Sequence, residues 1–494
     1  MLRQNKSMKR LLFVIYNVDF VDNFGICVLS AVAKKCGWEV YFEVFNIITI
    51  GTVFKSIKPS IVCYSAMSTD ADIYIRINNF LKSKYEFTSI MGGPHPTFFP
   101  DVINNEGIDY ICRGEGELAF EEFLNKYAKG ENCDDIENFN SKRKINPLRN
   151  YIEDIDTIPM PDRSLIFEKT ELKYSPLKTF MTSRGCPFSC SYCYNEALKS
   201  EYKGKGKFVR FHSPERIVAE ICVVREKYPL KIIKYEDDLF GANKAWLEKF
   251  TKIYKKEVGI PFNCLQRLDI INRESLLLLK EANCVSITAP IDSGSKRIRE
   301  DILKRDMSLT NEEICKKFEM IKSMGINVFS SCIIGAPTST LEDEMLGVEL
   351  HVDGKVNFAM ASILTPFPKT SIWHYCKDNG LLGEEAKDKV ASILSRSSLK
   401  GFTEKEKDIQ WNLATLYPAI IQFSFLRRCL LWVAQHTKPK AIYTLVNVLV
   451  KGYLMSKYIY PFKGNWGIRI KMLIKAIRIE VNRMLGRSDK RIDL

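Results

Sequence analysis

Short apolar runs alternate with longer amphipathic segments along the first 130 residues of the chain. The runs have the length of strands, whereas segments such as 25–36 and 71–84 carry apolar side chains three and four positions apart, as helices do. This alternation predicts right-handed βαβ units and a doubly wound, flavodoxin-like parallel sheet. The expected strands are residues 11–16, 39–44, 61–64, 89–91 and 110–112.

A second alternating series begins near residue 178 and runs to about residue 364. Six consecutive βα units of this kind predict a second parallel sheet, separate from the first. The expected strands are 178–182, 232–235, 262–266, 285–290, 327–334 and 359–364, and the expected helices include 214–227, 245–256, 273–281 and 311–324.

The length of 494 residues is too great for one hydrophobic core. Residues 130–144 are charged, rich in asparagine and poor in apolar side chains, which predicts a linker. Beyond residue 401 the alternation stops and helical patterns take over. The expected parts are a sheet domain at 1–130, a linker or arm at 131–175, a second βα domain at 176–400 and a mostly helical region at 401–494.

The net charge of +14 is concentrated near the C-terminus. Residues 411–494 contain 15 Lys or Arg against 3 Asp or Glu, and the rest of the chain is almost neutral. Residues 468–479 predict a basic amphipathic helix, which fits a cap on the neighbouring domain, an anionic membrane surface or RNA. Because no RNA-reading module is present, nucleic acid is disfavoured. No run has the length of a membrane span and no signal peptide is recognisable, so a reducing cytoplasm is expected.

Small and polar residues follow three successive strands of the first series. Parallel sheets bind ligands at the carboxyl ends of their strands, and small side chains let a large flat ligand approach the backbone. No G-x-G-x-x-G follows the first strand, so a dinucleotide site has little support. The residues at these ends are Ser65, Met67 and Ser68, then Gly92, Gly93 and His95, then Arg113, Gly114 and Glu115.

Three cysteines, Cys186, Cys190 and Cys193, follow the first strand of the second series with the spacing C-x3-C-x2-C. Three thiolates can hold an iron–sulfur cluster and leave one iron open. A structural zinc site would need a fourth ligand, and the nearest downstream candidate, His212, lies at no zinc-finger spacing. Disulfides are disfavoured because the 15 cysteines are odd in number and mostly scattered through apolar runs. The triplet therefore predicts a cluster with an open coordination position.

The triplet, with Gly185 and Pro187 around its first cysteine, resembles the radical S-adenosylmethionine (SAM) superfamily. The small-residue sheet domain that precedes it is similar to the cobalamin-binding domain of the B12-dependent class, and the resemblance covers about residues 11–370. It implies a [4Fe–4S] cluster on the triplet, SAM at the open iron and cobalamin on the N-terminal domain. It also implies a Rossmann-type fold for that domain and a partial (β/α)6 TIM-like barrel at 176–400.

The same resemblance places SAM contacts at the strand ends of the barrel, where functional residues of such barrels gather. Two adjacent carboxylates follow the second strand, where related enzymes contact the SAM amino group. Arg267 is expected to pair with the SAM carboxylate through its forked donors. Asp292 replaces the glutamate that is usual in the turn reaching the ribose. The expected SAM-binding residues are Tyr192, Asp237, Asp238, Arg267, Asp292, Ser293 and Gly335.

The nine strand-end residues of the first domain are, by this resemblance, the expected cobalamin contacts. In other cobalamin proteins a histidine after the first strand ligates cobalt from below, but here Asp22 stands at the matching position. We therefore expect cobalamin to bind with no protein histidine on its lower face. His95 lies between two prolines and is expected to hydrogen-bond or pack rather than to ligate cobalt.

The resemblance implies a radical SAM enzyme, and most simply a methyltransferase acting on an unactivated carbon or phosphorus centre. A ring-forming or oxidative rearrangement would use the same cofactors and stays open. A methylthiotransferase is disfavoured, because that family carries further N-terminal cluster cysteines and a terminal RNA-binding barrel. A non-catalytic cobalamin sensor would leave the triplet without a role. The expected partners are a small-molecule or lipid-like substrate, an electron donor such as flavodoxin or ferredoxin, and a membrane surface contacted by the basic tail.

Overall fold

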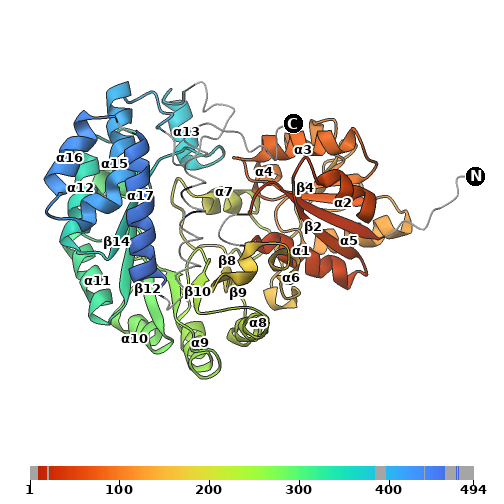
Figure 1. Ribbon diagram of the computed structural model, residues 1–494, viewed down its shortest axis with the longest axis horizontal. Coiled ribbons are helices and arrows are strands. Elements are labelled where there is room, and N and C mark those ends of the chain that lie inside the picture. Colours follow the sequence, from red (N-terminus) through yellow and green to blue (C-terminus); the bar gives the residue numbers. More distant parts are fainter. Residues whose placement is uncertain are drawn as a thin grey trace, which may run out of the picture. The chain divides into compact units, whose positions relative to one another are not determined.

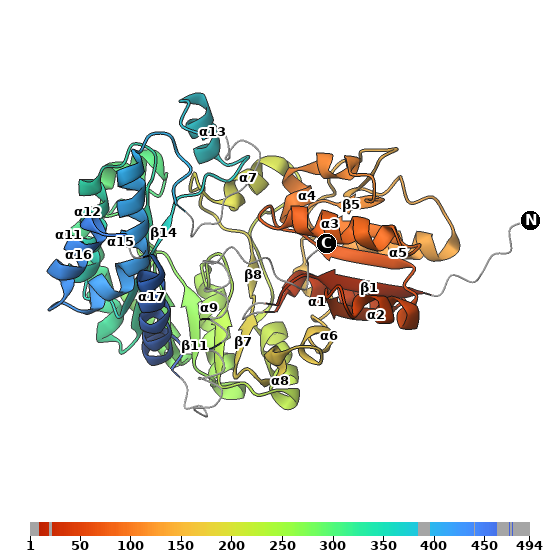
Figure 2. The ribbon, with the colours of Figure 1, turned by 45° about the horizontal axis from the view of Figure 1, so that its top comes forward.

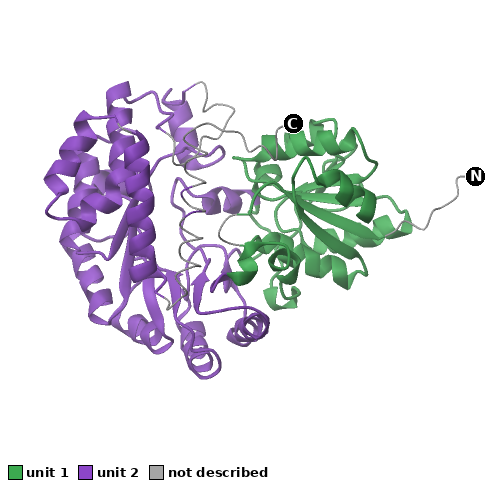
Figure 3. Cartoon of the chain, viewed as in Figure 1, with its two compact units in different colours: residues 1–174, 202–207, 487–494 green, residues 175–201, 208–486 purple. Residues whose placement is uncertain are grey.

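The computed structural model describes residues 9–18, 22–383, 396–438, 440–461, 474 and 477 (Figure 1). These residues fall into two compact units (Figure 3). Unit 1 contains the described residues up to Tyr174 together with Tyr202–Lys207. Unit 2 contains Ser175–Glu201 and the described residues from Phe208 onward. The basic helix expected at 468–479 lies almost entirely outside the described residues.

Unit 1 is built on a six-stranded sheet with the order β2-β1-β3-β4-β5-β6. Its strands are β1 (Arg10–Ile15), β2 (Glu39–Val44), β3 (Ile61–Ser65), β4 (Thr88–Gly92), β5 (Tyr110–Cys112) and β6 (Phe139–Ser141). Its helices are α1 (Phe24–Lys35), α2 (Ile50–Ile57), α3 (Ala71–Lys82), α4 (Pro94–Phe98), α5 (Glu117–Lys129) and α6 (Ser164–Phe167), with 3-10 turns at Pro100–Asn104, Ile155–Thr157 and Glu171–Tyr174. Strands β1 to β5 are parallel, in the flavodoxin-like order that the pattern predicted.

Part of the expected linker belongs to this sheet. Strand β6 pairs antiparallel with β5. Asparagine side chains in and beside β6 hydrogen-bond to backbone groups of the neighbouring loops. Asn140 Oδ1 accepts from the Asn146 backbone N–H at 2.9 Å, and Asn138 Nδ2 donates to the Glu115 carbonyl at 2.7 Å. The linker prediction was wrong for this stretch because buried asparagines, which read as loop residues in the sequence, replace apolar contacts with hydrogen bonds.

Unit 2 is built on six parallel strands that are adjacent in chain order, β14-β13-β12-β11-β10-β7. They are β7 (Leu177–Phe180), β10 (Ile232–Tyr235), β11 (Phe262–Leu265), β12 (Cys284–Thr288), β13 (Asn327–Ile334) and β14 (Phe358–Ile363). Strand β8 (Ser183–Arg184) pairs antiparallel with β9 (Arg210–Phe211) in a separate two-stranded sheet. The helices are α7 (Tyr194–Glu201), α8 (Pro214–Lys227), α9 (Lys244–Glu257), α10 (Arg273–Glu281), α11 (Asn311–Ser323), α12 (Leu341–Asp353) and α13 (Ser371–Asp378), with a π-helical turn at Ile298–Ile302. Sequential neighbours in a parallel sheet are the arrangement of an open TIM-like barrel, so the predicted fold is confirmed.

Local capping explains why the barrel helices begin where they do. At Asn272, Thr310, Thr340 and, in the C-terminal region, Thr403, the side chain accepts from the backbone N–H three residues on, and the backbone N–H of the capping residue donates to the side chain of that same third residue. Such capping boxes satisfy two otherwise unpaired donors at a helix start. The short β8–β9 sheet and the π-helical turn have no capping or periodicity pattern in the sequence, and the sequence did not predict them.

The C-terminal region adds the helices α15 (Glu404–Gln422), α16 (Arg427–His436) and α17 (Lys440–Leu454), and a π-helical turn at Met455–Ile459. Helix α15 packs along the edge strand β14 (Figure 2). The turn after α17 reaches the amino ends of the barrel strands, where Ser286 Oγ donates to the Ile459 carbonyl at 2.7 Å. The described part of the tail is therefore a packed element of unit 2.

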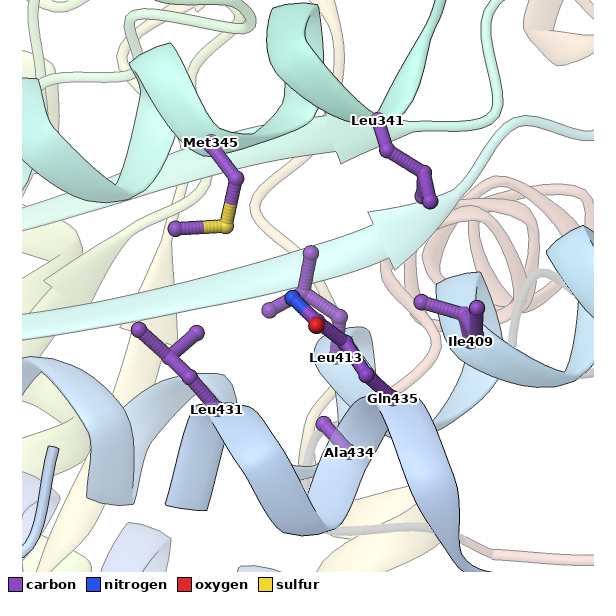
Figure 4. Close-up of a pocket in the computed structure, with 7 residues that line it drawn as sticks. All are labelled: Leu341, Met345, Ile409, Leu413, Leu431, Ala434 and Gln435. Carbon is purple, nitrogen blue, oxygen red and sulfur yellow. The ribbon is translucent and has the colours of Figure 1, made fainter. Parts of the chain in front are cut away.

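Apolar side chains of helices α12, α15 and α16 pack together. They face one another across a small pocket, which Gln435 borders from α16 (Figure 4). Because the lining is apolar, this pocket serves packing of the helical layer rather than chemistry. The apolar residues are Leu341 and Met345 of α12, Ile409 and Leu413 of α15, and Leu431 and Ala434 of α16.

Within unit 1, the arm that follows the sheet is fastened to α1. Asp22 and Arg163 form an ion pair whose side chains are each 3% exposed. Asp162 accepts a hydrogen bond from Ser30 Oγ and pairs with Lys34 Nζ, both at 2.6 Å. Asn23 caps α1 by accepting from the Ile26 backbone N–H at 3.1 Å. The residues before α1 are thus fixed by charge and capping, and not by apolar packing alone.

Replacing Asp22 with alanine should destabilise unit 1 by about 3 kcal/mol, because it leaves the buried Arg163 guanidinium without its partner. Denaturant titration monitored by hydrogen exchange in α1 and β1 measures this effect. Glu281→Ala breaks an exposed pair with Lys255 and should leave the unfolding midpoint unchanged. Equal effects of the two substitutions would contradict the structural role of the buried pair.

A buried histidine links α12 to the barrel and the tail. His351 Nδ1 lies 2.7 Å from the Tyr417 hydroxyl of α15, and Nε2 lies 2.8 Å from Ser330 Oγ of β13. Burial lowers the pKa of His351 to about 3. The unfolded chain therefore takes up a proton near pH 6.5 that the folded protein does not accept until far lower pH.

Unit 2 should accordingly lose stability as the pH falls from 6.5 towards 3, by about 1 kcal/mol for each pH unit from this group. His351→Gln should flatten that slope, and subtracting its profile from that of the wild type removes the contribution of the carboxyl groups. His436, which is exposed, provides the matched control His436→Gln. Hydrogen exchange of α12 and α15 as a function of pH reports the slope, and an unchanged slope in His351→Gln would refute the assignment.

Candidate functional site

The cysteine triplet lies on the loop between the β8 strand and helix α7, and Ser191 anchors this loop. The Ser191 backbone N–H donates to the Leu303 carbonyl at 3.0 Å, and its hydroxyl donates to the Ile302 carbonyl at 2.7 Å. Its own carbonyl accepts from the Ile372 backbone N–H at 2.9 Å. The π-helical turn after β12 and the start of α13 therefore hold the loop at the carboxyl ends of the barrel strands, where such barrels place their chemistry.

Two buried arginines point at the middle cysteine. Arg267 Nη1 lies 3.9 Å and Arg305 Nη1 lies 3.8 Å from Cys190 Sγ. Burial, with contributions from Asp238 and the two other thiols, raises the pKa of Cys193 to about 11. Positive charge beside closely spaced thiols favours their deprotonated form. The arginines thus supply the charge that three thiolates on one loop require.

Arg305 belongs to a network that also includes Asp292 and Tyr192. Arg305 Nε lies 2.6 Å from Asp292 Oδ2, and the Tyr192 hydroxyl donates to the same oxygen at 2.6 Å. Burial opposes the charge of Arg305, but the Asp292 carboxylate raises its pKa overall. Asp292 itself adopts a left-handed backbone conformation with φ of 61°. Because Tyr192 precedes the last cysteine, this network ties the triplet loop to the end of β12.

The expected SAM contacts Asp237 and Asp238 have different surroundings. Asp237 is buried, and its Oδ1 accepts from the Thr182 backbone N–H at 3.0 Å and from the Ser183 hydroxyl at 2.5 Å. Burial raises the pKa of Asp237 to about 6. Asp238 is exposed and lies near enough to raise the pKa of Cys186 and Cys193. Asp238 in turn accepts hydrogen bonds from the Asn195 side chain and the Gly185 backbone, and burial raises its pKa. Both carboxylates therefore support the loops at the strand ends, and contact of Asp238 with SAM stays a prediction.

Arg267 and Ser293, two further predicted SAM contacts, are engaged within the protein. The Arg267 guanidinium bonds both carboxylate oxygens of Asp269, at 2.9 and 2.8 Å, and stacks 3.5 Å from the centre of the Phe188 ring. Ser293 Oγ accepts from the Ser295 backbone N–H at 3.1 Å. Their direct contact with SAM stays a prediction, and the structure instead gives Arg267 a position against Cys190.

The turn after β13 carries Gly335, whose φ of 73° is left-handed. The Gly335 backbone N–H donates to Glu344 Oε1 at 2.8 Å, and Ser339 Oγ donates to the same oxygen at 2.8 Å. Burial raises the pKa of Glu344 to about 7. Glu344, which the sequence did not single out, therefore shapes the strand end at which Gly335 is expected to contact SAM.

At the strand ends of unit 1, two adjacent glycines have different reasons for lacking a side chain. At Gly93, with φ of 98°, a Cβ would lie 2.7 Å from the Ala66 carbonyl oxygen. At Gly92 a Cβ would meet no protein atom nearer than 3.9 Å. The fold thus demands glycine at 93, whereas at Gly92 a Cβ would make only ordinary van der Waals contacts with Cys112 and Tyr64. Met67 after β3 and Ile48 after β2 are exposed apolar side chains at the same edge of the sheet.

The remaining residues predicted for this edge are bonded to one another. His95 starts helix α4, where its Nδ1 lies 3.3 Å from Ser68 Oγ and its ring stacks on Phe99. Burial lowers the pKa of His95, so the ring is neutral at pH 7. This agrees with the expected hydrogen-bonding and packing role. Ser65 ends β3 and pairs in register with Gly92 of β4.

The turn after β5 is held by residues from elsewhere in unit 1. The Gly114 backbone N–H donates to Thr97 Oγ1 at 2.9 Å, and Arg113 Nε donates weakly to the Thr97 carbonyl at 3.4 Å. The Glu115 backbone N–H donates to the Tyr202 hydroxyl at 3.1 Å. Tyr202, which follows helix α7 in the chain, was not foreseen, because nothing in its sequence surroundings marks the return to unit 1.

The residues present fit the implied iron–sulfur cluster and the implied cobalamin. Among the described residues, no three His, Cys, Asp or Glu side chains are placed close enough to hold a metal ion, so the cluster assignment rests on donor chemistry: three thiols on one anchored loop with two guanidinium groups at Cys190. The edge of unit 1 offers exposed apolar groups for a large flat ligand and, at Gly92, a backbone position that no side chain covers. Asp22, at the position of the usual histidine, is paired with Arg163. Binding of cobalamin without a protein histidine on its lower face stays a prediction.

Comparison with protein families gives two matches along the chain. Residues 180–347 match the radical SAM superfamily, and residues 17–124 match the B12 binding domain. Together they confirm the expected cofactor set of a [4Fe–4S] cluster, SAM and cobalamin at the level of the two domains.

The chain is similar to several known proteins. The chain is 30% identical over 366 residues to an uncharacterised methyltransferase of Pyrococcus horikoshii, which covers 72% of this chain and 78% of that protein. It is 24% identical over 310 residues to the anaerobic magnesium-protoporphyrin IX monomethyl ester cyclase of Rubrivivax gelatinosus, covering 59% of this chain and 54% of the cyclase. The radical SAM methyltransferase TsrM from Kitasatospora setae, solved with cobalamin and a [4Fe–4S] cluster, superposes with a TM-score of 0.65 at 14% identity, covering 96% of this chain and all of that one.

The fold, the cysteine loop and these matches agree with one another. None of the helices in the described part of the chain combines the length and the apolar content needed to cross a bilayer. The chain belongs to the radical SAM superfamily, in the class that carries an N-terminal B12 binding domain.

Proposed function

We propose that this protein is a cobalamin-dependent radical SAM methyltransferase that acts on an unactivated carbon or phosphorus centre. The observation that carries the proposal is the loop of Cys186, Cys190 and Cys193, with Arg267 and Arg305 directed at Cys190, in a chain with a B12 binding domain. The similarity to the Pyrococcus methyltransferase supports transfer of a methyl group as the reaction.

In unit 2, the three cysteines would hold the cluster, which supplies the electron that cleaves SAM to a carbon radical. Arg267 and Arg305 offset the negative charge of the thiolates. Asp238, exposed beside the cysteine loop, is the carboxylate available to the SAM ammonium group. Asp292 and Tyr192 keep the loop in register with the strand ends.

In unit 1, cobalamin would supply a methyl carrier. Gly92 allows its ring close to the backbone, while Met67 and Ile48 present apolar surface to it. His95 and Ser68 brace one another at this edge. Because Asp22 is neutralised by Arg163, no carboxylate or imidazole side chain from this position is free to ligate the metal.

A second candidate function is an oxidative or ring-forming reaction with the same cofactors. The similarity to the Rubrivivax cyclase favours it, although this chain spans only 54% of that protein. Both functions need the same cluster, so the residues of the cysteine loop do not separate them, and the fate of the SAM methyl group does.

The partners and location belong to the same proposal. We expect a small-molecule or lipid-like substrate and an external one-electron donor such as flavodoxin or ferredoxin, because the cluster must be reduced before SAM is cleaved. A reducing cytoplasm suits an oxygen-sensitive cluster and the absence of disulfides among the described cysteines.

Replacing Cys190 with alanine should abolish formation of 5′-deoxyadenosine, since two thiols do not hold the cluster firmly. The assay is anaerobic turnover of SAM by reconstituted protein with a reductant, and iron and sulfide are counted in parallel. Cys429→Ala changes an exposed cysteine remote in sequence from the loop and should retain both the cluster and turnover. Wild-type turnover by Cys190→Ala would refute the cluster assignment.

Anaerobic reaction with SAM that carries a deuterated methyl group should give a product bearing the intact labelled methyl. The wild-type protein is incubated with cobalamin, a reductant and a small-molecule extract, and products are compared by mass spectrometry with those from unlabelled SAM. A product whose mass is the same with either SAM, formed together with 5′-deoxyadenosine, would instead identify the oxidative or ring-forming reaction.

A further inference from the structure

Helix α17 exposes an apolar stripe on the side away from its packing contacts. Ile442, Leu445, Leu449 and Tyr453 are 62%, 48%, 44% and 54% exposed. Their spacing of three, four and four residues places them on one helical face over about 16 Å. A helix on the surface of a globular domain normally turns polar residues to water, so this face is unusual for a simple cap.

The opposite side of α17 is fixed to the rest of unit 2. Tyr443, Thr444 and Leu454 are buried, and Asn447 Nδ2 donates to the Thr415 carbonyl of α15. Leu454 packs in the apolar cluster that contains Ile232 and Phe358 at the start of the barrel strands. Helix α17 is therefore packed firmly against unit 2 on one side, and the exposure of the stripe does not result from a loosely attached helix.

Further exposed apolar groups precede the stripe in the chain. Phe425 and Leu426 lie just before α16, and Trp432 lies within it, all of them exposed. Helix α16 packs on α15, as α17 does. Aromatic side chains with a polar edge, such as Trp and Tyr, are favoured where protein meets the headgroup region of a bilayer.

The chain segment that carries the stripe has charges of one sign. Residues 424–461 contain six cations and no Asp or Glu. Lys438 lies 2.7 Å from Asp408 of helix α15. A second copy of the chain would bring like charges together on the same face, whereas an anionic surface complements it. The cations are Arg427, Arg428, Lys438, Lys440, Lys451 and Lys457.

We propose that the stripe of α17 docks the protein on an anionic lipid bilayer, with Ile442, Leu445, Leu449 and Tyr453 inserted among the headgroups and the neighbouring cations bound to lipid phosphates. The apolar face supplies insertion and the cations supply the preference for anionic lipid, as in interfacial helices. The inference is independent of the reaction proposed above, because none of these residues belongs to the cysteine loop or to the strand ends.

Flotation of the full-length protein with lipid vesicles tests the proposal. Vesicles of phosphatidylcholine mixed with phosphatidylglycerol should carry the protein, and vesicles of phosphatidylcholine alone should carry about tenfold less. Raising the salt concentration should weaken the binding, because the headgroup attraction is screened.

Leu449→Glu should reduce binding to the anionic vesicles by about tenfold, because it places a carboxylate in the inserted face. Leu277→Glu is the matched control: Leu277 is 51% exposed on helix α10 of the same unit, and its replacement should leave vesicle binding unchanged. Both positions are exposed, so thermal unfolding should be the same for the two variants, and 5′-deoxyadenosine formation without lipid should match the wild type.

Four results would overturn the proposal. The first is equal binding of the protein to neutral and anionic vesicles, or binding to neither. The second is anionic binding that Leu449→Glu leaves intact. The third is a dimer of the free protein, seen by sedimentation velocity and lost in Leu449→Glu, which would assign the stripe to a second copy. A large loss of thermal stability in Leu449→Glu alone would likewise assign it to a segment of this chain.

Discussion

The structure of the candidate site depends on positive charge placed against Cys190. Two buried guanidinium groups face one sulfur, and each is itself held by a carboxylate, Arg305 by Asp292 and Arg267 by Asp269. Buried charges of this kind are stable only in pairs with satisfied donors. The consequence is that the loop, the end of β11, the end of β12 and the π-helical turn form one electrostatic unit, so the cysteines cannot move independently of the barrel.

The same logic explains why several predicted SAM contacts have structural partners. Asp237 accepts bonds from Thr182 and Ser183, and Tyr192 donates to Asp292. Residues at the carboxyl ends of barrel strands must satisfy one another's polar groups before they can present any to a ligand. Asp238 is more exposed than Asp237, but it too accepts hydrogen bonds, from Asn195 and from the Gly185 backbone. Glu344 and Arg305 act one step further back, by fixing the backbone and the charge that a ligand would meet.

Two adjacent glycines of unit 1 lack a side chain for different reasons. Gly93 is required by its own backbone conformation and by the nearness of Ala66, whereas at Gly92 the fold leaves space that a side chain could fill. Only at the second kind of glycine can the missing side chain be explained by a ligand rather than by the backbone itself. Asp22 likewise has a structural role at a position where other cobalamin proteins have a metal ligand. Its ion pair with Arg163 fastens the arm to α1.

The sequence by itself determined both parallel sheets, most helix bounds and the cysteine loop, because hydrophobic periodicity and ligand spacing are local properties of the chain. It did not reveal β6, whose buried asparagines resemble a loop, nor Arg305, Glu344 and Tyr202, which come to their partners from distant positions. Nor did it reveal that one face of α17 is left uncovered, since an apolar residue in a helical pattern reads as core whichever way it points. Only the tertiary structure decided these points, because hydrogen-bond partners, charge neighbours and exposure are set by contacts between residues far apart in the chain.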